Sequence, residues 1–221
     1  MNAARGCSVA LAPPRPAAAV PVRFALAAAA LLLALPALAQ PASPDVVALS
    51  VDLSEAQRAH LWRVGAWGLA NAVGGAALWL SADAEGAPGW RAFGLQSAAW
   101  GAINTGIAVV GLAGGAGEPT ADWAAALAAE NTYADILLVN LGLNVGYAAV
   151  GTTLWAVSGR GVSNPAAWRG HGIALIVQGA GLFVLDTVAY LGTRTRLGDL
   201  VDLGAASLTA GPGGVTLVVG L

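Results

Sequence analysis

Long apolar stretches separated by short polar turns run through most of the sequence. Four of these stretches are long enough to cross a bilayer as helices, for which about 20 residues suffice. They lie at residues 61–80, 90–112, 133–157 and 167–191. Turns containing glycine or proline, at 81–89 and 158–165, join the first two and the last two. The pattern therefore predicts an all-α fold, an integral-membrane four-helix bundle over residues 54–192.

The third stretch carries its two asparagines on one side. At about 100° per residue, Asn140, Asn144 and Tyr147 share one helical face. Gly142 and Gly146 lie on the far side, where a small-residue surface is expected to permit close packing of a neighbouring helix. A helix with a polar stripe and a smooth opposite face needs neighbours on both sides, so we place it at the centre of the bundle.

Polar side chains also occur within the other three stretches. An uncompensated polar group in hydrocarbon is costly, so each one is a candidate for an intramembrane site. The predicted polar cluster comprises Asn71, Asn104, Asn140, Asn144, Tyr147, Gln178 and Asp186. Asp186 is the only acid deep within a span, and two interpretations stay open for it. It is either a proton or cation site, or a structural acid hydrogen-bonded to Asn140, Asn144 or Tyr147.

The first 39 residues have the pattern of a signal peptide. Three arginines precede the apolar run 24–35, and Ala37-Leu-Ala39 provides a small-residue cleavage site. We expect removal after Ala39, with an uncleaved anchor as the alternative. Residues 40–53 then form an extracytoplasmic lead-in, in which 45–52 is a candidate strand. Ser54 and Gln57 have capping-box spacing and predict the start of the first helix.

Two further segments lie outside the spans. Thr120 is a candidate cap for a short interfacial helix over 122–130. In the tail, 193–221, the turn Gly211-Pro-Gly-Gly214 precedes the β-prone run 215–219, which predicts an extramembrane β-hairpin, with residues 46–51 as a candidate pairing partner.

The signal peptide also predicts the orientation. It starts the mature chain outside the cell, which puts both hairpin turns in the cytoplasm and both mature termini outside. Arg91, Arg160 and Arg169 flank the inner turns, in agreement with the positive-inside rule, whereas arginines in the two tails disagree with it. The predicted location is the bacterial cytoplasmic (inner) membrane.

The two predicted hairpins resemble each other. Gly75-Ala-Ala-Leu-Trp79 and Trp90-Arg91-Ala-Phe-Gly94 correspond to Gly151-Thr-Thr-Leu-Trp155 and Trp168-Arg169-Gly-His-Gly172. A duplicated hairpin would relate the halves by an axis along the membrane normal. Convergence is the alternative, because Trp-Arg suits a cytoplasmic helix end.

Composition narrows the function. Hydrophobic residues make up 57% of the chain and charged residues 10%, far below the roughly 25% of soluble domains. The net charge of −2 argues against nucleic acid as a partner. With Cys7 as the one cysteine and no nucleophile, phosphate-loop or zinc motif, we expect no catalytic residues, no metal and no cofactor. The expected partners are the lipid bilayer, other membrane proteins or a second copy.

Three motifs resemble those of an uncharacterised family of small bacterial four-span membrane proteins, over about residues 58–190. They are Trp100-x-x-x-Asn104, Asn140-x-Gly142-Leu143-Asn144-x-Gly146-Tyr147 and Gln178-Gly179-x-x-Leu182-x-x-x-Asp186. That family often has an acidic residue where this chain has Asn144, and the resemblance implies the span count without any chemistry. We therefore predict a non-enzymatic membrane protein with structural or interaction duties. The alternative is a small carrier or proton-coupled protein that uses an outer-facing cluster around Asp186.

Overall fold

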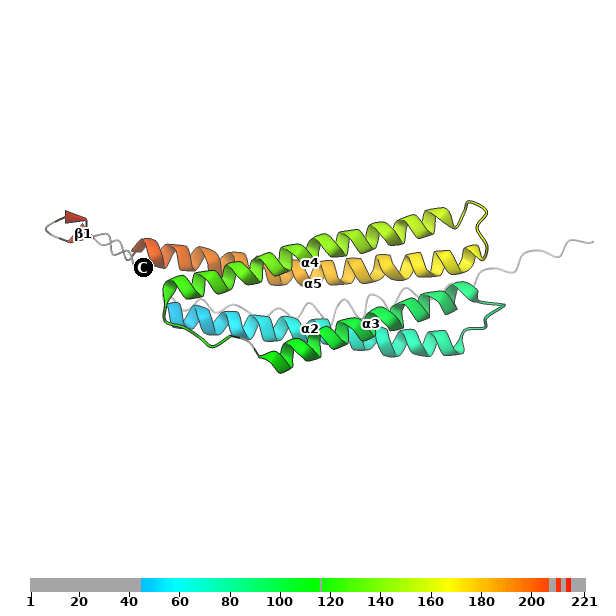
Figure 1. Cartoon of the computed structure of the whole chain (residues 1–221), viewed down its shortest axis with the longest axis horizontal. Helices are drawn as coiled ribbons and strands as arrows, with labels where there is room; N and C mark the ends of the chain where they lie inside the picture. The colour runs from blue at the N-terminus through cyan, green and yellow to red at the C-terminus, as the bar shows by residue number, and fades with distance from the viewer. Residues whose placement is uncertain (1–44, 116, 207–209, 212–213, 216–221) are drawn as a thin grey trace, which may run out of the picture. The chain divides into compact units, whose positions relative to one another are not determined.

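In the part of the chain that the structure describes, a computed structural model, four long α-helices are present (Figure 1). In chain order they are α2 (Val46–Ser81), α3 (Pro88–Gly114), α4 (Trp123–Val157) and α5 (Pro165–Ala206). The predicted all-α fold with four helices is confirmed. The structure describes residues 45–115, 117–206, 210–211 and 214–215. The predicted signal peptide lies outside these residues.

The first helix begins earlier than the sequence predicted. Its N-cap is Asp45, whose side chain accepts a hydrogen bond of 2.7 Å from the amide of Ala48. Ser54 lies inside the helix and donates its hydroxyl to the carbonyl of Ser50. The predicted strand at 45–52, its pairing with the tail and the capping box at Ser54 are therefore wrong. The helix continues because Leu49 and Leu53, one turn apart, both bury their side chains in the core.

The last two helices are also longer than predicted. The expected interfacial helix is continuous with α4, and Asp122, rather than Thr120, caps it through the amide of Ala125. Helix α5 continues to Ala206 instead of ending near residue 191. With 35 and 42 residues, these helices measure about 52 and 63 Å, well beyond a hydrocarbon layer of about 30 Å. Beyond α5, the backbones of β1 (Ala210–Gly211) and β2 (Gly214–Val215) pair antiparallel.

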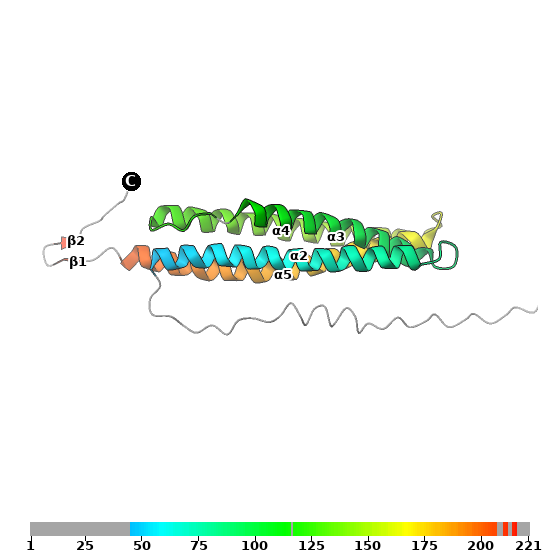
Figure 2. The ribbon, with the colours of Figure 1, turned by 90° about the horizontal axis from the view of Figure 1, so that it is seen from below.

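The helices alternate in direction. The turns between α2 and α3 and between α4 and α5 lie at one end of the bundle, which we call the turn end (Figure 1). The start of α2, the α3–α4 connection and the last part of α5 lie at the opposite end, which we call the terminal end. Helix α2 packs mainly on α3, α4 packs mainly on α5, and α5 also contacts α3 and α2. Figure 2 shows α3 and α4 on one side of this arrangement and α2 and α5 on the other.

The two hairpins pack in the same register. A Cβ added to Gly75 would lie 2.7 Å from the carbonyl oxygen of Gly94, so α2 and α3 touch through their backbones there. The equivalent Cβ on Gly151 would lie 2.5 Å from the carbonyl oxygen of Gly172, between α4 and α5. These four glycines are the ones that the repeated sequence aligns, so the likeness between the hairpins extends to their helix contacts.

The prediction for the other face of α4 is wrong. A Cβ on Gly142 or Gly146 would meet nothing within 4 Å, and both residues are exposed. The reason is that α5 contacts the opposite face of α4, through Gly151, so the Gly142 face has no helix against it among the described residues.

Apolar packing at the terminal end resembles that of a water-soluble bundle. Leu49, Ala126 and Leu200 form a buried cluster between α2, α4 and α5. Next to it, the carboxylate of Glu130 pairs with the guanidinium of Arg196, and their side chains are 1% and 12% exposed. These contacts join the parts of the three helices that exceed the thickness of a hydrocarbon layer.

In the middle of the bundle, large apolar side chains lie on the outside and several polar side chains lie in the interior. Large apolar side chains face outward, among them Val110 on α3, Val139 on α4 and Val184 on α5, all at least half exposed. Three helices, α3, α4 and α5, are long and apolar enough to cross a membrane. Helix α2 is not among them, because its first half is charged and its second half contains Asn71 and four glycines.

Candidate functional site

Two of the predicted polar residues belong to a closed network of hydrogen bonds. The side-chain amide of Gln178 on α5 donates to the Asn71 side-chain oxygen at 2.6 Å and accepts from the Trp67 indole at 3.0 Å. Asn71 in turn donates to the Trp67 carbonyl at 2.8 Å. Gln178 is 1% exposed and Trp67 and Asn71 are half-buried, and this ring of hydrogen bonds joins α2 to α5. Because its groups satisfy one another, we interpret the ring as structural.

A second polar group surrounds Asp186 on α5. The Asn144 side chain of α4 donates to one carboxylate oxygen of Asp186 at 2.6 Å. The Nε2 atom of His60 on α2 lies 3.1 Å from the other oxygen. All three residues are buried, with 3 to 6% of their surface exposed. Asp186 is therefore held from two sides by two different helices.

A cleft of about 420 Å³ opens beside this group. No Cα atom of α3 lies within 8 Å of one in α4 over the whole length of both helices, although α2 and α5 are in contact. The cleft occupies the gap on the α3–α4 side, and its walls include His60, Asn104, Tyr133 and Asp186. Its lining is mostly apolar, with a few polar groups grouped together, which is typical of a small-molecule site.

One aromatic pair spans the gap between α3 and α4. The rings of Trp100 and Tyr147 lie 4.6 Å apart between centroids, and both residues line the cleft. In the alignment of the two similar hairpins, these rings occupy the positions of the other polar pair. A shift of 76 positions takes Asn71 to Tyr147, and a shift of 78 positions takes Trp100 to Gln178. The compact Asn71–Gln178 pair thus lies between α2 and α5, and two large rings lie at the equivalent place between α3 and α4. We infer that the rings hold α3 and α4 apart and so create the cleft.

Several buried polar atoms of the cleft residues have no hydrogen-bond partner within the described structure. They are the Nδ1 atom of His60, the Nδ2 atom of Asn104 and the hydroxyl of Tyr133. Ser97 contributes the fourth such atom, and it does not line the cleft. Buried polar groups are nearly always paired, so three unpaired groups around one cleft indicate a place for a ligand or ordered water.

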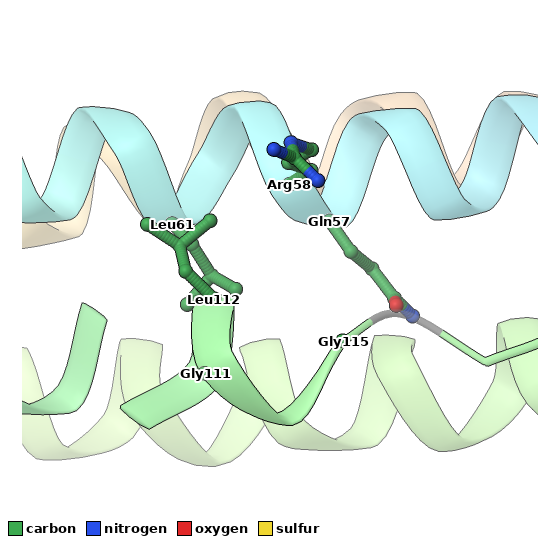
Figure 3. A pocket seen from close by; sticks show the side chains of 6 residues that line it. All are labelled: Gln57, Arg58, Leu61, Gly111, Leu112 and Gly115. Carbon is green, nitrogen blue, oxygen red and sulfur yellow. The ribbon is translucent and has the colours of Figure 1, made fainter. Parts of the chain in front are cut away.

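The cleft reaches the terminal end of the bundle. There it shares Gln57, Leu61, Gly111 and Gly115 with a smaller recess of about 60 Å³. Figure 3 shows Leu61 against the end of α3 and the Gln57 side chain extending toward the loop beside Gly115. Toward the turn end, the Trp100–Tyr147 pair lines the cleft, and beyond it α3 and α5 touch closely at Gly89 and Gly170.

The predicted cluster thus divides into two groups. Asn104, Asn140, Asn144, Tyr147 and Asp186 all line the cleft. Asn71 and Gln178 instead belong to the ring of hydrogen bonds between α2 and α5.

The sequence interpretation missed His60 and Tyr133. His60 lies just before the first predicted span, which starts at residue 61, so it was not counted among the polar residues within the spans. The helical spacing of His60, Val64 and Trp67 was the available signal, since these three residues share one face of α2.

The chemistry of the cleft is that of a binding site. Among the lining residues, Asp186 and His60 are the only groups of the Asp, Glu, His, Lys and Arg types. Within the described part of the chain, no three His, Cys, Asp or Glu side chains are grouped as metal ligands. The arrangement can hold a polar head by hydrogen bonds and an apolar body by contact.

Fold and site together define a helical bundle with membrane-compatible helices and a polar-ended cleft between two of them. Residues 63–187, more than half of the chain, match a family of unknown function, DUF6992, and the chain belongs to that family. The matched region contains Asp186, Asn144 and Asn104 and leaves out His60 and Arg196. No curated protein and no solved structure matches the chain.

Proposed function

We propose that this protein is a four-span integral membrane protein that binds a small lipid-soluble molecule in the cleft between α3 and α4. Its role is binding and not catalysis. The observation that carries the proposal is the set of unpaired buried polar atoms on His60, Asn104 and Tyr133, next to the Asp186 carboxylate. A purely structural bundle would be more stable with these atoms paired or replaced by apolar groups.

The distribution of side chains supports membrane insertion. Amides and a carboxylate are buried, whereas large aliphatic side chains face outward. Helix α2 must accompany α3 into the bilayer, because the two backbones touch at Gly68 and Gly75 along the apolar part of α3. This contact supports four crossings, although α2 alone is not apolar enough to predict one.

We place the turn end in the cytoplasm and both mature termini outside, in the inner membrane of a bacterium. Arg91, Arg160 and Arg169 lie near the turn end, as the positive-inside rule requires. Reporter fusions test the orientation: one at Gly86 should report a cytoplasmic position and one at Gly117 an external position. A cytoplasmic signal at Gly117 would reverse the orientation.

The rim of the cleft supports a ligand that comes from the lipid. Ile107, Ile136 and Leu143 line the cleft and are about half exposed. Facing water, these side chains would form an unfavourable apolar patch, whereas in a bilayer they adjoin acyl chains. A lipid-soluble molecule can therefore reach the Asp186 end of the cleft from the side, between α3 and α4.

Ligand retention tests the binding function. We would purify the full chain from membranes in mild detergent and identify the extractable small molecules by mass spectrometry. Ile107→Trp should fill the cleft and lose a molecule that the wild type retains. Val109→Trp is the matched control, because Val109 is as exposed as Ile107 on the same helix but does not line the cleft. Equal small-molecule content in all three proteins would contradict the binding function.

A second candidate function, a proton-coupled carrier, is favoured by the His60–Asp186 pair at the base of the cleft. A carrier would need Asp186 to exchange a proton, so Asp186→Asn should abolish transport but leave retention of a neutral ligand unchanged. If Asp186→Asn supports full activity in a transport assay with the retained molecule, the carrier function is excluded.

A further inference from the structure

Building on the proposed binding function, we infer that the ligand of this cleft is an uncharged amphiphile whose head carries a hydroxyl group. The head lies among His60, Asn104 and Tyr133, and the apolar body lies along the rim between α3 and α4. Three features of the cleft lead to this class: its charge, its unpaired hydrogen-bonding atoms and its apolar rim.

The charge of the cleft disfavours an ionic head. No arginine lines the cleft, and the chain contains no lysine, so a phosphate or carboxylate would find no permanently charged cation there. Its nearest acidic neighbour would be Asp186, whose carboxyl oxygens offer acceptors and not the donors that an anion needs. A cationic head would have to share the two oxygens of Asp186 with the contacts that His60 and Asn144 already make to them. Arg58 lines only the small recess at the terminal end.

The unpaired atoms specify the hydrogen bonds of the head. The Nδ2 atom of Asn104 can only donate, so the head must contain an acceptor. The Nε2 atom of His60 lies 3.1 Å from a carboxylate oxygen of Asp186, so we assign a ring proton to Nε2. The Nδ1 atom of a neutral His60 is then an acceptor, so the head must also contain a donor. The Tyr133 hydroxyl can donate or accept a hydrogen bond.

A hydroxyl is the smallest group that both donates and accepts. A ketone or an ester would satisfy Asn104 and leave the Nδ1 atom of His60 unpaired. If His60 were instead doubly protonated, its Nδ1 atom would donate, and a hydroxyl oxygen would accept that bond as well. A hydroxyl is therefore compatible with both protonation states of His60, and the neutral state selects it over a ketone or an ester.

The remaining surface suits an apolar body. Ile107, Ile136 and Leu143 form the rim, and the rings of Trp100 and Tyr147 lie toward the turn end. The volume of about 420 Å³ falls within the range of sites for drug-sized molecules. Such a site accommodates the head and the first part of a tail, while the rest of the tail stays in the lipid.

Two kinds of membrane molecule have this chemistry, a glycerolipid with a free hydroxyl and a reduced quinone. We would therefore measure the thermal unfolding midpoint of the full chain in detergent, by circular dichroism, with dioleoylglycerol and separately with decylubiquinol kept reduced. Stabilisation by either probe supports the inference, and the probe that stabilises identifies the source. At a hundredfold excess over Kd the expected rise is about 5–10 °C. Dioleoylphosphatidic acid, which has the same tails and a charged head, should give a rise of less than about 1 °C at the same concentration.

The variant Asn104→Leu provides the sharpest test. It removes an unpaired buried amide, so the ligand-free protein should unfold at the same temperature or higher. Its affinity for the stabilising probe should nevertheless fall about tenfold, the equivalent of one net hydrogen bond. Ile107→Trp should abolish the stabilisation, and Val109→Trp should retain it.

The measurements distinguish a failure of the hydroxyl inference from a failure of the proposed binding function. The inference is overturned if phosphatidic acid stabilises as strongly as the hydroxyl probes, or if Asn104→Leu binds them with wild-type affinity. It is also overturned if neither probe stabilises a protein that retains another molecule lost in Ile107→Trp, in which case the binding function stands. If the wild type, Ile107→Trp and Val109→Trp are alike in both retention and stabilisation, the binding function itself fails.

Discussion

Replacement of Arg196 by methionine tests the contact that closes the terminal end of the bundle. Arg196 on α5 donates from Nε and Nη2 to the two carboxylate oxygens of Glu130 on α4, and its Nη2 also donates to Thr193 at 3.0 Å. Because the Glu130 side chain is 1% exposed, Arg196→Met would leave a buried carboxylate without its counter-ion.

The expected cost follows from this burial. Removal of one partner from a buried ion pair typically destabilises a protein by about 3–5 kcal/mol, mostly through the desolvated charge that remains. Replacement of both partners by apolar residues of similar volume is often neutral or stabilising. The double variant Glu130→Leu/Arg196→Met should therefore recover most of the loss caused by Arg196→Met, with a coupling free energy of about 3 kcal/mol.

The measurement is reversible unfolding in mixed detergent micelles, followed by circular dichroism. Arg194→Met is the matched control, because Arg194 is exposed on the same helix and should change the unfolding free energy by less than about 0.5 kcal/mol. The reasoning is refuted if Arg196→Met stays within about 1 kcal/mol of the wild type. It is equally refuted if the double variant is no more stable than Arg196→Met.

Three further predictions concern the interior of the bundle, all measured by the same unfolding assay. Gly151→Ala should lower the unfolding free energy by about 1–3 kcal/mol, because its Cβ would lie 2.5 Å from a backbone oxygen of α5. Gly146→Ala should be neutral or stabilising by up to about 1 kcal/mol, because its Cβ would meet nothing within 4 Å. Similar effects at both sites would contradict the helix contacts. Gln178→Leu should cost about 1–3 kcal/mol, because it breaks two interhelical hydrogen bonds, and a loss below about 0.5 kcal/mol would show that the ring contributes little. A double-mutant cycle of Asp186→Asn with Asn144→Leu should give a coupling of about 0.5–2 kcal/mol, and a coupling of zero would remove the Asn144–Asp186 contact from the site.

The helices and the cleft differed in how far the sequence could predict them. The number and order of the helices followed from the apolar stretches, because length and hydrophobicity are local properties of the chain. The ends of the helices were wrong at α2, α4 and α5, where apolar residues such as Leu49 and Leu200 pack on other helices beyond the predicted spans. Such packing extends a helix past the point where its own sequence would suggest a stop.

The polar residues were predicted individually, and their partners were not. Asn144 could be placed on a helical face, but its bond to Asp186 depends on how α4 and α5 are rotated against each other. Glu130 and Arg196 were missed as a pair for the same reason, since they are far apart in the sequence and meet where both helices extend beyond the predicted spans.

The sequence by itself determined that this chain forms four long helices, that most of their surface is apolar, and which few positions are polar. These properties depend only on the order of the residues along each helix. The tertiary structure decided which helix faces meet, that His60 joins Asp186, and that α3 and α4 stand apart around a cleft. Rotation and spacing between helices depend on contacts between distant residues, here glycines that bring backbones together within each hairpin and the Trp100–Tyr147 ring contact between α3 and α4.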